Sequence, residues 1–247
     1  MKPYYQDDAV TIYCGDCREI VPTLGRFDLL LTDPPYSSGG QFRGDRAMAP
    51  SVKYINSDSQ ETCKHEFSGD NLDQRAFLSW ASMWLSCCHE NAKEGAVAML
   101  FTDWRQLPIM TDAIQHGGWV WRNIITWWKP GIRMQRGRPS SSAEYVVYAS
   151  KGIPTAGELS PQNVLKFAPV GGSDKEHICE KPLELIRTLV GLSEIGATIL
   201  DPFAGSCTTG RAAKDLGRKA VLIEREERYC EIGAKRMQQE VLPLYAE

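Results

Sequence analysis

The sequence predicts an α/β fold in which a doubly wound, mostly parallel sheet forms one domain. Two observations lead to this prediction. Short apolar runs rich in Val, Ile and Leu recur along the chain, and each ends in turn or small residues. Between them lie longer segments in which apolar residues recur at helical spacing. Runs of about four to eight residues are typical of buried strands, and their alternation with helices favours a sheet covered on both faces.

The individual elements follow in chain order. The expected strands are residues 10–14, 28–32, 96–102, 123–128, 145–150, 198–201 and 219–223. The expected helices are residues 73–92, 104–116, 182–192, 208–216 and 226–240. Two segments, 37–71 and 152–176, are polar and glycine-containing and fit neither pattern. Long stretches without regular structure are usually functional, so we expect both to be loops inserted at the active edge of a single domain that spans 1–247.

The composition is ordinary for a folded protein and excludes several classes. Of 247 residues, 43% are hydrophobic and 24% are charged, which excludes wholesale disorder, collagen-like repeats and coiled coil. No run approaches the roughly 20 apolar residues of a membrane span. The N-terminus lacks the apolar segment of a signal peptide. We therefore expect a cytoplasmic protein with no membrane partner.

The net charge of −3 excludes a basic nucleic-acid coat, but one stretch is locally basic. Residues 129–151 hold five cations and a single acid, Glu144. Such a stretch could track the phosphates of a nucleic acid, and a solvated loop is the alternative. The candidate phosphate contacts in it are Lys129, Arg133, Arg136 and Arg138.

The eight cysteines are expected to be reduced, because the chain shows no export signal. Cys14 and Cys17 form a C-x2-C pair, and Cys63 and His65 follow. A zinc site built from these four residues is an alternative that the poor spacing of the second pair disfavours. We therefore expect no metal.

The strongest chemical signal is the segment Asp33-Pro34-Pro35-Tyr36, which directly follows the apolar run 28–32. Ligands of open α/β sheets bind beyond the carboxyl ends of strands, and Asp33 lies at such an end. The two prolines stiffen the turn and donate no backbone hydrogen bond. A carboxylate, a rigid carbonyl group and the ring of Tyr36 would together receive a flat group that carries NH2. A plain proline-rich turn is the alternative.

A second signal is the small-residue turn that follows the run 198–201. Gly205 permits close approach of a ligand to the backbone, and Thr208 or Thr209 can cap the helix that comes next. The N-terminus of a helix suits a carboxylate or a phosphate. A turn of this kind is weak evidence when it stands alone.

Two acids at neighbouring strand ends strengthen the signal. Glu224 ends the next strand, where an acid would hold a ribose diol. Asp16 follows the run 10–14 and could accept a hydrogen bond from the exocyclic amino group of an adenine. Together with the small-residue turn, Glu224 indicates a cofactor that contains adenosine.

These residues resemble those of the β group of S-adenosylmethionine-dependent DNA amino-methyltransferases. The segment 33–36 matches the catalytic tetrapeptide of that family, and 201–206 matches its cofactor motif. Residues 177–182 resemble its His-x-x-x-Lys-Pro element, and 15–17 resemble its segment before the catalytic strand. The resemblance covers nearly the whole chain. Because the catalytic motif precedes the cofactor motif, it implies a circularly permuted, seven-stranded Rossmann-like methyltransferase sheet.

The resemblance also implies roles for individual residues. The catalytic residues would be Asp33, Pro34, Pro35 and Tyr36. The residues that bind S-adenosylmethionine would be Asp16, Asp33, His177, Lys181, Asp201, Phe203, Ala204, Gly205, Ser206, Cys207, Thr208, Thr209 and Glu224. The inserted loops 37–71 and 152–176 would take part in DNA recognition.

The implied reaction is site-specific transfer of a methyl group from S-adenosylmethionine to an amino group of a base in double-stranded DNA. The base would be flipped out of the duplex. An Asp at the first position of the tetrapeptide is usual in N6-adenine enzymes, whereas N4-cytosine enzymes more often carry Ser, so we favour adenine. The resemblance further implies a homodimer and a cognate restriction enzyme.

Other functions remain as alternatives. They are N4-cytosine methylation, methylation of a protein amide or an RNA base, and a DNA-binding module of the same fold without turnover. The last alternative depends on Cys207, because the family usually has Gly there and a side chain could crowd the cofactor. The chain also departs from the family in its short recognition segment, 152–176, and in lacking a visible separate DNA-binding domain.

Overall fold

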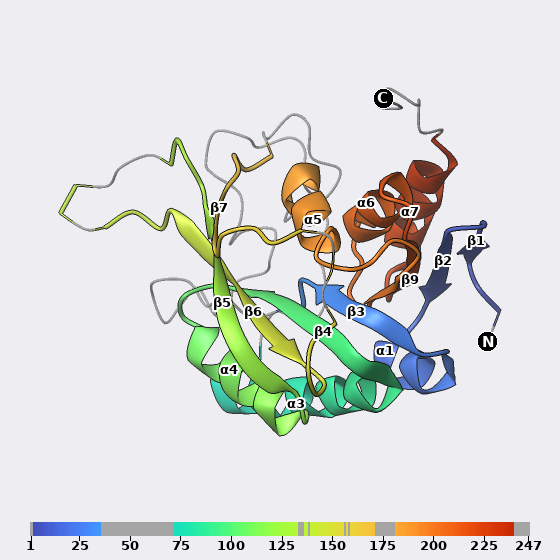
Figure 1. Cartoon of the computed structure of the whole chain (residues 1–247), viewed down its shortest axis with the longest axis horizontal. Helices are drawn as coiled ribbons and strands as arrows, with labels where there is room; N and C mark the ends of the chain where they lie inside the picture. The colour runs from blue at the N-terminus through green and yellow to red at the C-terminus, as the bar shows by residue number, and fades with distance from the viewer. Residues whose placement is uncertain are drawn as a thin grey trace.

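The fold is built on one sheet that runs through the part of the chain that the structure describes. The structure is a computed structural model, and it describes residues 2–35, 72–132, 136–137, 139–155, 157, 159–170 and 181–239. Within these residues the sheet has nine strands in the order β1-β2-β9-β8-β3-β4-β6-β5-β7. Helices cover both of its faces (Figure 1). The predicted α/β, doubly wound architecture is therefore confirmed.

The middle of the sheet is parallel. From one side to the other it holds β2 (Val10–Cys14), β9 (Lys219–Glu224), β8 (Thr198–Asp201), β3 (Phe27–Thr32) and β4 (Ala92–Thr102). The next strand, β6 (Ala143–Ser150), is antiparallel to β4 and to β5 (Val120–Trp128). These are the seven strands that the apolar runs predict.

Two short edge strands bring the total of the described strands to nine instead of seven. They are β1 (Tyr5–Gln6), antiparallel to β2, and β7 (Val164–Lys166), parallel to β5. With two and three residues, they are too short to show the alternation from which a strand is predicted. They extend a sheet whose other strands are predicted correctly.

The helices form two layers. On one face α1 (Cys17–Ile20), α3 (Gln74–Asn91) and α4 (Leu107–His116) pack on the sheet. On the other face lie α5 (Leu183–Val190), α6 (Thr208–Asp215) and α7 (Glu227–Gln238). The five longer helices fall within their predicted ranges, whereas α1 and the 3₁₀ turn η1 (Val21–Thr23) are not predicted. No helix of the described residues is both long enough and apolar enough to span a membrane.

The longest helix shows why the sequence folds in this way. In α3 the fully buried residues Phe77, Ala81, Trp84 and Cys88 recur at spacings of three and four, so they share one face of the helix. Asp73 precedes the helix, and its carboxylate accepts hydrogen bonds from the first free backbone N–H groups. The apolar stripe fixes the orientation of the helix on the sheet, and the cap fixes its start.

The β5–β6 hairpin extends past the carboxyl edge of its neighbour. The pairing of β4 with β6 ends at Thr102 and Tyr145, whereas β5 and β6 remain paired through Trp127 with Glu144 and Trp128 with Ala143. Figure 1 shows this end of the two strands projecting beyond β4. Glu144 therefore lies at the same edge of the sheet at which β3 ends.

Candidate active site

Four parallel strands bring their carboxyl ends to one edge of the sheet. β2, β9, β8 and β3 are consecutive neighbours, and each predicted acidic residue lies at or just after one of these ends. Thus Asp16, Glu224, Asp201 and Asp33 gather at one edge from widely separated parts of the sequence. This is the edge at which ligands of parallel sheets bind.

Asp33 is the acid whose carboxylate has an open oxygen. Its Oδ2 forms an ion pair with the ammonium group of Lys181, whereas its Oδ1 is buried and has no hydrogen-bond partner among the described residues. Burial raises the pKa of Asp33, the positive charge of Lys181 opposes this shift, and the negative charge of Glu144 adds to it. Pro34 is buried and Pro35 half-buried, and Tyr36 lies outside the described residues. An unpartnered buried acceptor at this edge suits an incoming N–H donor.

Asp201 has a structural environment that the sequence did not indicate. Its carboxylate is 3% exposed and accepts hydrogen bonds from the hydroxyl of Thr32, at 2.7 Å, and the backbone N–H of Phe203, at 3.1 Å. Burial raises its pKa to about 6, although the hydroxyls of Thr32 and Thr209 lower it. Its carboxylate joins the end of β3 to the turn after β8, and its contact with the cofactor stays a prediction.

That turn is held close to the end of β9. The N–H of Ala204 donates to Ile223 O at 3.0 Å, and the N–H of Gly205 donates to Glu224 Oε2 at 2.9 Å. The other oxygen of Glu224 accepts from the N–H of Glu226 at 2.8 Å. Each carboxylate oxygen keeps acceptor capacity, so Glu224 has a fixed orientation and can still receive a diol. Burial raises its pKa, while the backbone N–H groups oppose that shift.

Cys207 occupies a position that usually requires glycine. Its φ is +62°, in the left-handed region, and it is the sole described non-glycine residue with positive φ. Its side chain is fully buried and faces α7, where a Cβ on Gly233 would lie 2.3 Å from the Cys207 Sγ. The expectation that this side chain crowds the cofactor is therefore wrong, because the side chain packs into the core.

Arg236 of α7 holds the same turn, a role that was not predicted from the sequence. Its guanidinium donates to Ser206 O and to Thr208 Oγ1, both at 3.0 Å. Phe203, predicted to contact the cofactor, packs its ring against Trp80 and Trp84 of α3, with ring centroids 5.5 and 5.0 Å apart. Its backbone belongs to the turn after β8, and its contact with the cofactor stays a prediction. The helical spacing of these two segments predicts α3 and α7 but gives no sign that their side chains hold this turn.

Asp16 lies where it is expected, but its carboxylate already has a partner. It forms an ion pair with Arg18 at 2.6 Å and caps α1 through the N–H of Arg18 at 2.9 Å. The hydrogen bond to Arg18 holds its pKa below the usual value against the opposing effect of burial. Any contact with a cofactor amino group would have to share these oxygens.

The predicted phosphate contacts differ in their surroundings. Lys129 is largely buried. Its ammonium group pairs with Glu144 and lies 4.8 Å from the centroid of the Trp127 ring. Its ammonium already has a carboxylate partner, and its contact with a phosphate stays a prediction. Arg136 is exposed. Arg133, Arg138 and His177 lie outside the described residues.

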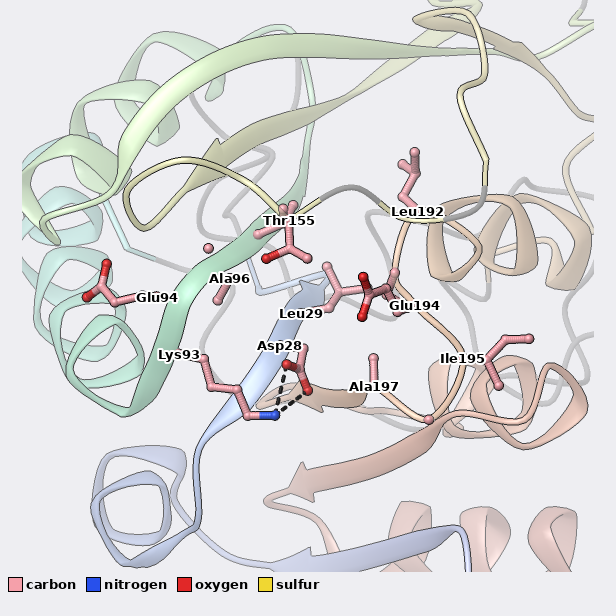
Figure 2. A pocket seen from close by; sticks show the side chains of 14 residues that line it. Asp28, Leu29, Lys93, Glu94, Ala96, Thr155, Leu192, Glu194, Ile195 and Ala197 are labelled. Carbon is pink, nitrogen blue, oxygen red and sulfur yellow. Dashed lines mark hydrogen bonds and ion pairs between the residues drawn. The ribbon is translucent and has the colours of Figure 1, made fainter.

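A cavity at the opposite edge of the sheet contains none of the predicted site residues. It has a volume of about 210 Å³ and lies at the amino ends of β3, β4 and β8. Figure 2 shows the Lys93 ammonium directed at the carboxylate of Asp28. Because Asp28 also accepts from the N–H of Thr198, at 2.9 Å, this carboxylate has a structural role.

The described residues hold no cluster of three or more side chains arranged to bind a metal. Cys14 and Cys17 are free thiols, and the other two residues of the alternative zinc site, Cys63 and His65, lie outside the described residues.

Comparison with known proteins identifies the family. The N6/N4 methyltransferase model, described as DNA methylase, matches residues 27–235. The chain therefore belongs to the DNA methylase family. The type II methyltransferase M2.MboI of Moraxella bovis is 25% identical over 273 residues, which cover 99% of this chain and 93% of that protein. M2.DpnII of Streptococcus pneumoniae, also a type II methyltransferase, is 26% identical over 263 residues, which cover 97% and 93%.

Solved structures share the fold. M1.HpyAVI in its complex with SAM gives a TM-score of 0.66 at 22% identity, and the match covers 93% of this chain and 100% of that chain. The PvuII DNA methyltransferase, described as cytosine-N4-specific, gives a TM-score of 0.74 at 18% identity and covers 98% and 90%. These likenesses establish the methyltransferase fold.

Proposed function

We propose that the chain methylates the N6 amino group of adenine in double-stranded DNA, with S-adenosylmethionine as the methyl donor. The observation that carries this proposal is the open Oδ1 of Asp33 at the carboxyl edge of the sheet. An amino group has hydrogen atoms to donate, and a carboxylate oxygen without a partner can accept one. Asp at this position, which the resemblance associates with adenine enzymes, supports adenine over cytosine.

The residues present fit the proposed cofactor. Glu224 is oriented by two backbone N–H groups, and the turn at Gly205, whose φ is +50°, allows a ligand to approach the backbone. When bound, S-adenosylmethionine would supply the electrophilic methyl group. Glu224 would hold the ribose, and the backbone of residues 203–207 would lie along the rest of the cofactor.

The protein's own contribution to the reaction is alignment. The target base must leave the duplex, and its amino group would then donate to Asp33 Oδ1 and to the carbonyl of Pro34. These bonds would orient the lone pair of the nitrogen at the methyl group, which is an alignment effect. Lys181 keeps negative charge on Asp33, which strengthens the bonds that Asp33 accepts.

The experiment that tests this function uses purified protein, labelled S-adenosylmethionine and an unmethylated plasmid, with the modified nucleoside identified by its mass. N6-methyladenine is the expected product. N4-methylcytosine would replace the adenine assignment by the cytosine alternative. Binding of both partners without transfer would favour the non-catalytic DNA-binding module.

Arg136 is the described candidate for a phosphate contact, since it is exposed on the stretch that connects β5 to β6. R136A should weaken DNA binding and lower the slope of log K against log salt by about one. R26A serves as the control, because Arg26 is exposed just before β3, at the opposite edge of the sheet. An unchanged slope in R136A would remove this residue from the interface.

The assembly is part of the same proposal. A homodimer and a cognate restriction enzyme are implied by the resemblance alone. Sedimentation of the protein with and without DNA would test the first. Protection of methylated plasmid from a co-encoded nuclease would test the second.

A further inference from the structure

Glu144 is a buried acid for which neither the family motifs nor the proposed reaction gives a role. It lies on β6, and its paired residue across the hairpin is Trp127. Its side chain is 19% exposed, and one oxygen forms an ion pair with Lys129. The other oxygen, Oε2, is buried without a hydrogen-bond partner and faces the Lys181 ammonium at 3.5 Å. An acid with one oxygen paired closely to Lys129 and the other held at a distance from Lys181 calls for an explanation.

Lys181 lies between two carboxylates. Its ammonium contacts Oδ2 of Asp33 on one side and faces Glu144 Oε2 on the other, and it is within 5.1 Å of the centroid of the Phe101 ring. Its side chain is only 9% exposed, so water screens these charges weakly. Glu144 and Asp33 therefore both attract the ammonium group of Lys181, from opposite sides.

The position of Lys181 decides which oxygen of Asp33 is available. An ammonium group attracted by Asp33 alone would settle between its two oxygens and compete for both of them. The attraction of Glu144 displaces Lys181 toward β6, so that it bonds Oδ2 and leaves Oδ1 without a partner. We propose that Glu144 is a positioning residue, which acts through Lys181 to keep one oxygen of Asp33 open for the amino group of the target base.

The charges around Asp33 support this role and predict a change in pH dependence. Asp33 faces Lys181 before α5, Glu144 on β6, Lys129 after β5 and Asp201 on β8. Burial raises the pKa of Asp33, the two lysines oppose this, and Glu144 adds to it. Burial also opposes ionisation of Glu144, but Lys181 and Lys129 hold its pKa below the usual value. Glu144 is therefore ionised at the pH at which the enzyme would work.

The inference rests on the proposed function, and its test is the variant E144Q. Glutamine keeps the size of the side chain and removes its charge. We expect kcat for plasmid methylation to fall about 10- to 100-fold, the scale of a misplaced reacting group, with little change in the dissociation constant of S-adenosylmethionine. The acid limb of the kcat–pH profile should move to lower pH, because Asp33 then loses the neighbouring negative charge that raises its pKa. In E144D, which keeps the charge, part of the rate should return.

The control for this substitution is E94Q. This variant also replaces a glutamate by glutamine, but on an exposed side chain near the amino end of β4. We expect its kcat and its pH profile to match those of the wild type.

A double-mutant cycle with K181M separates positioning from general damage. K181M should itself lower kcat and move the acid limb to higher pH, because Asp33 loses its cation. If Glu144 acts through Lys181, E144Q should cost no further rate in the K181M background. An equal loss in both backgrounds, or an E144Q enzyme with wild-type kcat and pH profile, would overturn the inference. A wild-type enzyme that yields no methylated base would instead overturn the proposed function, and this inference with it.

Discussion

The dipeptide Asp-Pro occurs at the carboxyl ends of two neighbouring strands, as Asp33-Pro34 just after β3 and as Asp201-Pro202 at the end of β8, but the two carboxylates have different surroundings. Asp33 is 25% exposed and has an oxygen without a partner. Asp201 is 3% exposed and bonded to Thr32 and to the backbone of Phe203. One carboxylate can accept a bond from a ligand, and the other holds the edge of the sheet together. The comparison teaches that identical local sequences acquire separate roles from their partners across the sheet.

The arrangement of the strands explains the difference. Because β3 and β8 are parallel neighbours, the last residue of β3, Thr32, reaches the carboxylate that ends β8. Asp33 comes one residue later and meets Lys181 instead. The residue with the open oxygen is thus the one that lies beyond its strand.

The largest expected effect tests this division of roles directly. D33N should lower kcat by a factor of roughly 10²–10⁴, which is the range for a positioned catalytic side chain. The circular dichroism spectrum should not change. D201N is the matched control, since an amide oxygen can still accept from Thr32 and Phe203. Equal losses of kcat in the two variants would break the comparison.

Measuring stability as a function of pH tests the Asp201 half of this comparison. The pKa of Asp201 is raised from 3.8 to about 6 in the folded chain, so ionisation of this group disfavours folding. Its contribution to the free energy of unfolding is present below about pH 4 and is lost as the pH rises through about 6, by up to about 3 kcal/mol. Urea denaturation should show D201N gaining stability relative to the wild type across that range. A pH-independent difference would contradict the burial of a charge at Asp201.

The packing behind the turn after β8 predicts a smaller effect. In G233A the new methyl group would meet the Cys207 Sγ, and we expect the free energy of unfolding to fall by about 1–3 kcal/mol. In the double variant C207G/G233A the sulfur is absent and the stability should return. C207G alone should be near neutral, because relief of the left-handed backbone, about 1–2 kcal/mol, offsets lost packing. Failure of C207G to rescue G233A would show that other contacts hold this turn.

The smallest expected effect concerns Arg236. R236A should raise the dissociation constant of S-adenosylmethionine by about tenfold, equivalent to about 1.4 kcal/mol, because the turn at Ser206 loses its fixed hydrogen bonds. K235A is the control, since the neighbouring Lys235 is 72% exposed and pairs along the helix with Glu231. Titration calorimetry of both variants measures the difference. Equal affinities would mean that the turn needs no support from α7.

Periodicity predicts the long elements of this fold well and the short ones poorly. The seven apolar runs and five amphipathic segments each correspond to an observed strand or helix, because the sheet is covered on both faces and its pattern follows burial. By contrast, α1 has four residues and β1 has two. Elements of that length are stabilised by caps and by pairing, such as the cap at Asp16, and leave no period in the sequence.

The sequence predicts the acidic residues of the candidate site but not the side chains that they contact. Motifs along the chain located Asp33 and Glu224, because both follow apolar runs. The contact between Glu144 and Lys181 was not predicted, since it depends on how far β6 extends past β4. A signal was present, because Glu144 is the single acid in a basic stretch. The sequence could mark it as unusual without showing which cation it meets.

The contact between Cys207 and Gly233 also has a consequence for the substitutions open to a lineage that carries both residues. The sulfur fills the space that a side chain at 233 would need, and the missing side chain at 233 is what lets a cysteine stand at 207. Each residue therefore entrenches the other. A larger residue at 233 fits only after position 207 has changed to glycine. The order in which the two substitutions occur therefore decides whether the intermediate sequence is stable.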